Sequence, residues 1–157
     1  MEYFIFAVFF VVLHVISYTF AGATALKFSA DLYRGSERLY DFHRDMNDEE
    51  ESRHVKIYFL PAQIVRGALL AVVLFPVLAL LSELTFVLLF AFIFGLLFIF
   101  TDLACVNPFP HNIEGLVYMR ERYIRRDKLV KLYYETTVYS LLMALGVSWV
   151  ILYSGWV

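Results

Sequence analysis

Two long apolar runs, separated by only two polar residues, constrain this chain more than any other feature. The runs cover Tyr58–Leu81 and Leu84–Ala104, and only Ser82 and Glu83 lie between them. Each run is long enough to cross the hydrocarbon core of a bilayer, which takes ~20 helical residues at about 1.5 Å per residue. Because two residues cannot carry the chain back across a membrane, the sequence predicts a tight antiparallel hairpin of two membrane-spanning helices.

The composition also indicates a membrane protein. Of the 157 residues, 61% are hydrophobic, whereas soluble domains contain about 45–50%. The length allows a single transmembrane domain, residues 1–157. A formal net charge of −2 gives no electrostatic basis for binding nucleic acid. Cys105 is the only cysteine, which excludes an internal disulfide and a zinc site built from cysteines.

The predicted fold class is all-α, an integral, multi-pass membrane four-helix bundle. The first apolar run has no Lys or Arg before it and is too long for the core of a signal peptide, so we expect a permanent span. In the second span, Pro61 falls in the first turn, and the interior Pro76 should kink the helix. The expected spans are residues 2–26, 58–81, 84–104 and 132–157, and two long loops, 27–57 and 105–131, join them.

Each long loop has one distinctive segment. In the first loop, five of the seven residues Asp45–Glu51 are acidic, which predicts a solvated segment. In the second, Asn112 follows a proline-rich stretch and is a typical N-cap, which predicts a basic amphipathic helix from Ile113 to about Lys131. Such a helix is suited to the surface of an anionic membrane leaflet.

The distribution of positive charge predicts the orientation in the membrane. Six of the thirteen Lys and Arg residues lie in Lys27–Lys56, six lie in Arg120–Lys131, and the remaining one is Arg66. Since cytoplasmic loops carry the excess of Lys and Arg, both long loops should face the cytoplasm. Both termini are then on the non-cytoplasmic side.

Arg66 and Asp102 are the two charged residues inside the apolar runs of the hairpin. An ionisable side chain costs ~2.5–3.5 kcal/mol at the centre of a spanning helix on insertion scales, and less near an end. A turn at Ser82–Glu83 places Arg66 level with Thr101. The sequence therefore predicts an intramembrane charge pair between Arg66 and Asp102, either direct or through one water. The alternatives are that each side chain reaches the aqueous boundary by itself, or that the two form an ion or proton site.

Polar residues of the first and fourth spans form a second candidate site. Histidine inside a membrane can relay protons or bind haem or a metal, but the favoured interpretation is a neutral His14 bonded to Tyr18 or to a serine of the fourth span. Small and hydroxylated residues also recur every four positions on the second and fourth spans, which is typical of helix packing faces. The alternative is a pore or proton site formed by His14, Ser17, Tyr18, Ser140 and Ser148.

The side chains of the loops match no metal or catalytic motif of fixed spacing. No metal site and no catalytic residue is therefore predicted, and no motif identifies a cofactor. The basic residues of the second loop are instead expected to contact anionic lipid head groups at the cytoplasmic face. These residues are His111, Arg120, Arg122, Arg125 and Arg126.

Three functions fit these observations. The favoured one is a non-catalytic membrane subunit that acts through helix–helix association, in a homo-oligomer or with other membrane subunits. The second is an oligomeric channel or transporter lined by the first and fourth spans. The third is an enzyme that acts on a lipid or lipophilic substrate at the membrane interface, and it requires a polar pocket at the level of Asp102.

Overall fold

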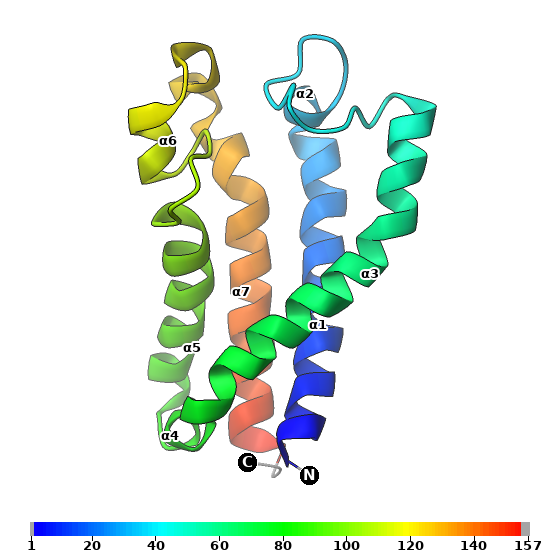
Figure 1. Ribbon diagram of the computed structural model, residues 1–157. Coiled ribbons are helices and arrows are strands. Elements are labelled where there is room, and N and C mark those ends of the chain that lie inside the picture. The colour runs from blue at the N-terminus through cyan, green and yellow to red at the C-terminus, as the bar shows by residue number, and fades with distance from the viewer. Residues whose placement is uncertain (1, 155–157) are drawn as a thin grey trace.

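The structure is a computed structural model, and it describes residues 2–154. The described part is all-helical, with no strands, and contains four helices long and apolar enough to span a membrane (Figure 1). The first span is α1 (Glu2–Phe28) and the fourth is α7 (Leu129–Tyr153). The second combines α3 (Glu49–Leu74), η1 (Phe75–Val77) and α4 (Leu78–Ser82), and the third combines α5 (Phe86–Phe94) with the π-helix η2 (Gly95–Leu103). The predicted all-α, multi-pass architecture agrees with this arrangement, and the last three residues of the predicted fourth span lie outside the described residues.

The second span begins nine residues earlier than predicted, so three of the five acidic residues in the tract are helical. The Asp48 carboxylate accepts a hydrogen bond of 2.8 Å from the backbone N–H of Glu51 and caps α3. Three glutamates fill the first turn, where negative charge is favourable at the positive end of the helix dipole. Pro61 therefore lies in the interior of α3. Pro76 interrupts the span as predicted, because the 3₁₀ turn η1 forms around it.

The third span changes from α-helix to π-helix at Gly95. In a π-helix each N–H bonds to the carbonyl five residues earlier, and the N–H of Ala104 donates to Ile99 at 2.7 Å in this way. The hydroxyl of Thr101 donates to the Leu97 carbonyl at 2.6 Å, which occupies an acceptor of the backbone ladder. This change of helix type was not predicted from the sequence.

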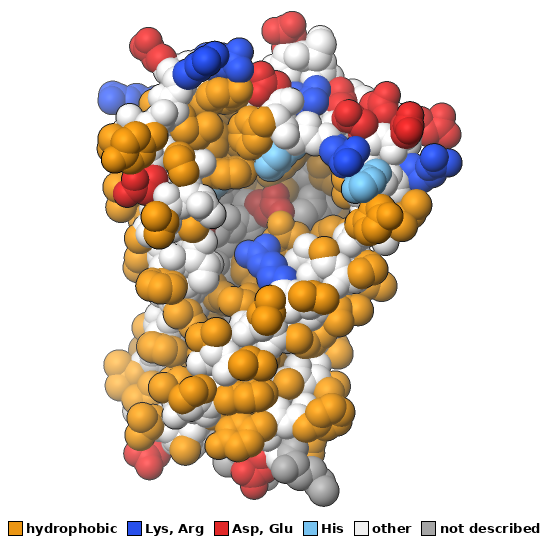
Figure 2. Space-filling view, viewed as in Figure 1, with side chains coloured by type: hydrophobic (Ala, Val, Ile, Leu, Met, Phe, Trp, Pro, Cys, Tyr) orange, Lys and Arg blue, Asp and Glu red, His pale blue; other side chains and the backbone are white. Residues whose placement is uncertain are grey.

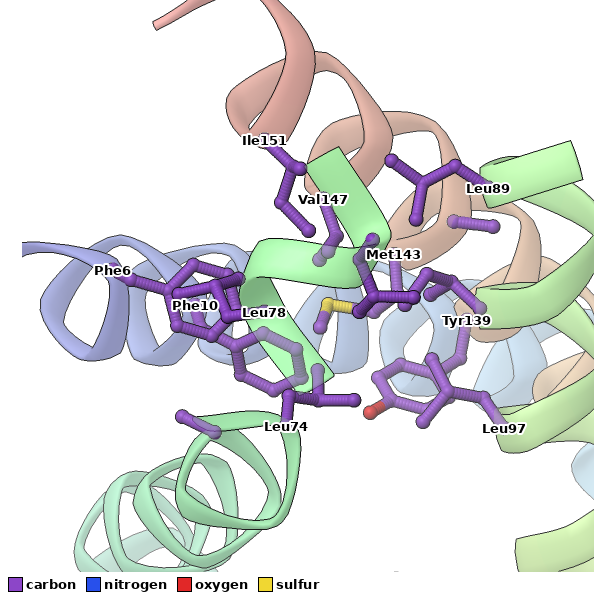
Figure 3. Close-up of a cluster of buried hydrophobic side chains, with 14 of the residues drawn as sticks. Phe6, Phe10, Leu74, Leu78, Leu89, Leu97, Tyr139, Met143, Val147 and Ile151 are labelled. Carbon is purple, nitrogen blue, oxygen red and sulfur yellow. The ribbon is translucent and has the colours of Figure 1, made fainter. Parts of the chain in front are cut away.

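The helices pack as a bundle in which α7 is central. Helix α1 packs against α3 and α7, and α5 packs against α7, whereas α3 runs diagonally with its upper end splayed away from α5 (Figure 1). The core lies between α1, α4, α5 and α7, where Phe10, Leu89, Met143 and Val147 are fully buried (Figure 3). In a membrane, close van der Waals packing between these side chains stabilises the bundle. The hydrophobic effect contributes little there, because lipid tails are as apolar as the side chains.

The stripes of small residues are packing faces within the chain, as the favoured interpretation expected. A Cβ atom on Gly67 would lie 3.1 Å from Cδ2 of His14 and 3.2 Å from Cα of Val11, so α1 and α3 approach closely there. Ala71, one turn further along α3, is fully buried. On α7, Ser140, Ala144 and Ser148 are fully buried too. The small side chains thus permit close contact between helices of one copy.

Both long loops lie at one end of the bundle (Figure 1). The opposite end contains α4, the beginning of α1 and the last turn of α7. We call the end with the two loops, formed by residues 29–48 and 104–128, the loop end. Its small core contains Leu32 of α2 (Ala30–Tyr33) packed with Leu39, Tyr40 and Leu132. The loop end therefore has a folded structure of its own above the four spans.

The continuous amphipathic helix predicted for Ile113–Lys131 is wrong. The chain forms three short pieces before α7, namely α6 (Ile113–Tyr118), η3 (Glu121–Tyr123) and η4 (Arg126–Lys128). Contacts with the first loop compete with helix formation, because Arg122 pairs with Asp41 at 3.3 Å and Lys128 pairs with Asp31 at 2.8 Å. Tertiary contacts override the helical periodicity of this segment.

Candidate functional site

A polar cavity lies between the four spans at the loop end. Its volume is about 480 Å³, and every span contributes to its wall. Figure 2 shows a hollow on this face, with a Lys or Arg side chain and an Asp or Glu side chain inside it. The wall is formed by Tyr18, Tyr33, His43, Arg66, Leu97, Thr101, Asp102, Cys105, Asn107, Phe109, His111, Asn112, Glu135, Thr136 and Tyr139.

Asp102 and His111 form an ion-pairing contact on the cavity wall. The Nε2 atom of His111 lies 3.0 and 3.1 Å from the two carboxylate oxygens of Asp102. The imidazole is only 5% exposed, and its Nδ1 atom has no hydrogen-bond partner within the described residues. Asp102 therefore fixes the orientation of the imidazole through Nε2, while Nδ1 is enclosed by protein atoms.

The turn before α6 positions His111. The Asn112 side chain accepts hydrogen bonds from the N–H groups of Phe109 at 2.9 Å and Gly115 at 2.7 Å, which confirms Asn112 as an N-cap. A Cβ atom on Gly115 would lie 1.7 Å from the Phe109 carbonyl oxygen, so only glycine fits there. The Tyr133 hydroxyl donates to the His111 carbonyl and ties the turn to α7.

Arg66 reaches the same cavity but forms no direct ion pair with Asp102. Its guanidinium lies 5.2 Å from the ring centroid of Tyr18 and 6.0 Å from that of Tyr139. No Asp or Glu within residues 2–154 forms a salt bridge with it. Of the two contacts predicted for this charge pair, the direct one is absent, although the hairpin does bring both side chains to one cavity. The aromatic faces stabilise the cation, while its hydrogen-bond donors remain available to a ligand.

Glu135 is a cavity residue that the sequence reasoning missed. The Tyr33 hydroxyl donates a hydrogen bond of 2.7 Å to its Oε2 atom. Burial, and then the Glu135 charge, raise the pKa of the Tyr33 phenol, so this hydroxyl remains a donor at neutral pH. The signal was present, because Glu135 is a carboxylate inside the predicted fourth span, where ionisable residues are rare and mark functional sites.

The candidate pore residues do not line a common path. His14 is fully buried, and its ring accepts from the Tyr139 hydroxyl at 2.7 Å and donates to Oε1 of Gln63 at 3.1 Å, an assignment that satisfies a neutral imidazole. The predicted bond to Tyr18 or to a serine is replaced by the one to Tyr139, although the Tyr18 ring stacks on His14 at 5.9 Å. Of the five candidates, Tyr18 lies on the cavity wall, while the other four are buried: His14, Ser17, Ser140 and Ser148.

The predicted head-group residues lie in different surroundings. His111 is buried against Asp102, and two of the arginines have acidic partners: Arg122 pairs with Asp41 at 3.3 Å and Arg125 with Asp127 at 2.7 Å. Arg120 and Arg126 are exposed at the loop end.

An open, shallow apolar surface borders the cavity at Arg66, and we call it the groove. It is formed by one face of α3 alone, and Arg66 is its one charged residue. Arg66 also lines the polar cavity, so the two spaces share a boundary. The groove is lined by Tyr58, Pro61, Ala62, Val65, Arg66, Leu69, Leu70 and Val73.

The cavity wall includes two histidines, His43 and His111. Within residues 2–154, no cluster of three or more His, Cys, Asp or Glu side chains is arranged to hold a metal ion. Burial, followed by the charge of Arg38, lowers the pKa of His43, which keeps this cavity imidazole neutral at neutral pH.

The comparisons with known proteins found no relative: no family model, curated protein or solved structure matches this chain.

Proposed function

We propose that this chain binds a phosphate-bearing amphiphile from the membrane, with the head group in the polar cavity and an acyl chain in the groove along α3. The observation that carries the proposal is Arg66, a cation without a carboxylate partner at the boundary between a polar and an apolar space. Arginine is suited to this role because its guanidinium donates paired hydrogen bonds to phosphate oxygens. A volume of about 480 Å³ lies within the ~300–1,000 Å³ that ligand sites occupy.

The same proposal includes the orientation predicted from the charges. The loop end faces the cytoplasm, so the cavity and groove open toward the inner leaflet. Helix α6 exposes Ile113, Leu116, Val117 and Tyr118 beside the basic segment that follows it, which suits a position in the head-group region. An amphiphile in that leaflet can then approach the cavity beside α3.

A second candidate function is catalysis on that amphiphile. The observation that favours it is the polar cavity at the level of Asp102, which the enzyme hypothesis requires.

The subunit and channel hypotheses have less support from the structure. The small-residue stripes that suggested association between copies pack within one copy. Most of the side chains that suggested a pore are enclosed by their neighbours. Association through the exposed apolar faces of the spans stays a separate proposal, which the oligomeric state in a mild detergent would test.

Lipid binding by Arg66 variants tests the proposed function. We expect Arg66→Gln to weaken binding of a defined phospholipid about 10- to 100-fold in native mass spectrometry, since hydrogen bonds to charged groups contribute ~1.5–3 kcal/mol. Arg66→Lys keeps the charge and should lose less. The matched control is Arg53→Gln, which removes an exposed positive charge from the same helix outside the cavity. Equal binding by Arg66→Gln and Arg53→Gln would refute the proposal.

A further inference from the structure

We infer that the head group is zwitterionic: a phosphate diester that carries a primary ammonium group, with the phosphate on Arg66 and the ammonium on Glu135. This inference rests on the proposed function and specifies its ligand. Its basis is that one cavity presents a cation and a carboxylate, and neither forms a salt bridge with the other or with any other charged group described in the structure.

The two carboxylates on the cavity wall differ in their partners. Asp102 is engaged by His111, and Asp31 by Lys128 and Lys131. Within residues 2–154, Glu135 forms no salt bridge at all. A carboxylate inside a spanning helix is costly unless it is paired, so a bound cation explains why it is retained.

One carboxylate oxygen of Glu135 has no hydrogen-bond partner. The Tyr33 hydroxyl occupies Oε2, and no hydrogen bond to Oε1 is found in the described part of the chain. Oε1 faces Gly22 of α1, which lines a second pocket that shares Tyr18, Tyr33 and Glu135 with the cavity. The ring of Tyr18 also lines this cavity, and aromatic faces attract ammonium groups. Oε1 is therefore an open acceptor beside an aromatic wall.

Other head groups fit the charges less well. The cavity wall carries Arg66 against Asp102 and Glu135, so a purely anionic head group would add negative charge next to two carboxylates. A simple cation would leave Arg66 without a partner. A quaternary ammonium has no N–H group to donate to Glu135. A primary ammonium on a phosphate diester satisfies both side chains.

The test compares lipids with the same acyl chains and different head groups, bound to the full-length protein in a mild detergent. The probes are phosphatidylethanolamine, its N-acetyl derivative, phosphatidylglycerol and free phosphoethanolamine, with affinities from native mass spectrometry. We expect wild type to bind phosphatidylethanolamine about 10-fold more tightly than either lipid without an ammonium. Free phosphoethanolamine should bind more weakly than the lipid because it cannot use the groove.

Substitution of Glu135 tests the assigned contact. Glu135→Gln should lower the affinity for phosphatidylethanolamine about 10-fold and leave phosphatidylglycerol unchanged or tighter. The matched control, Glu83→Gln, changes an exposed glutamate at the opposite end and should alter neither. Retained binding of phosphatidylglycerol shows that the Glu135 variant is folded.

The outcomes separate this inference from the function on which it rests. Equal wild-type affinity for phosphatidylethanolamine and its N-acetyl derivative would refute the inference of a zwitterionic head group, and this comparison needs no variant. If the two lipids bind equally and their binding depends on Arg66, the proposed function is retained without this inference. If no lipid binding depends on Arg66, both fail. If free phosphoethanolamine binds as tightly as the lipid, the ligand is soluble and the role of the groove is refuted.

Discussion

Removal of one hydroxyl group should measurably destabilise the bundle beside the cavity. In Tyr139→Phe the ring keeps its place, but His14 loses the donor that lies 2.7 Å from its Nδ1 atom. His14 is fully buried, so water cannot replace that donor. The variant therefore isolates one hydrogen bond between α1 and α7.

The expected magnitude follows from two opposing considerations. Hydrogen bonds between membrane helices contribute ~0.6 kcal/mol on average and up to ~1.7 kcal/mol. A buried acceptor left without any donor costs ~1–3 kcal/mol. Because this acceptor is buried and its other nitrogen is already engaged by Gln63, we expect a loss of about 1–2 kcal/mol. That corresponds to a ~5- to 30-fold increase in the unfolding equilibrium constant.

The assay is reversible unfolding in mixed micelles, followed by circular dichroism as the fraction of denaturing detergent rises. Tyr134→Phe is the matched control, because Tyr134 is on the same helix and its ring contacts Phe28 at 4.8 Å. No hydrogen bond of the Tyr134 hydroxyl occurs within the described residues. If the two variants lose the same stability, the buried bond to His14 does not hold α1 to α7, and the reasoning is wrong.

Two further predictions concern the loop end. Burial raises the pKa of the Asp31 carboxyl, but hydrogen bonds from two lysines and their charge outweigh burial and lower the pKa to about 2. The ionised carboxylate therefore stabilises the folded loop end above pH ~4, and this stabilisation is lost as the pH falls toward 2. Limited proteolysis should show the loop end opening over that range, and Asp31→Asn should open with less pH dependence. Cys105 is the single cysteine and is half-buried on the cavity wall, so a membrane-impermeant maleimide should label it in inside-out vesicles. Labelling in intact cells instead would contradict the cytoplasmic orientation.

The sequence predicted the spans well because a membrane restricts the choices. Long apolar runs have to be helices there, and a two-residue break has to be a turn. The ends of the spans were less accurate, since Asp48 extends α3 into a tract that composition alone marks as a loop. In the second loop, periodicity favoured a helix that contacts with Asp31 and Asp41 prevent.

The candidate site was predicted only in part, for a geometrical reason. Counting residues from the turn gives the depth of Arg66 and Asp102 in the membrane. Both residues were predicted at nearly the same depth, and both line one cavity. Counting does not give rotation about the helix axis, so it could not show that Asp102 turns to His111. The spacing of residues in the sequence also could not predict that His111, a loop residue, lines the cavity. Glu135, by contrast, was visible as a charge in a span.

The π-helix at Gly95–Leu103 makes the position of Asp102 depend on helix type as well as on the identity of the site residues. Each hydrogen-bonded turn there holds one residue more than in an α-helix, so successive side chains are rotated by less than the ~100° of an α-helix. If the same residues formed ordinary α-helix, Asp102 would point in a different direction about the helix axis although no side chain of the site had been replaced. Substitutions that remove the wider turns should therefore disturb the site even where they do not touch the cavity.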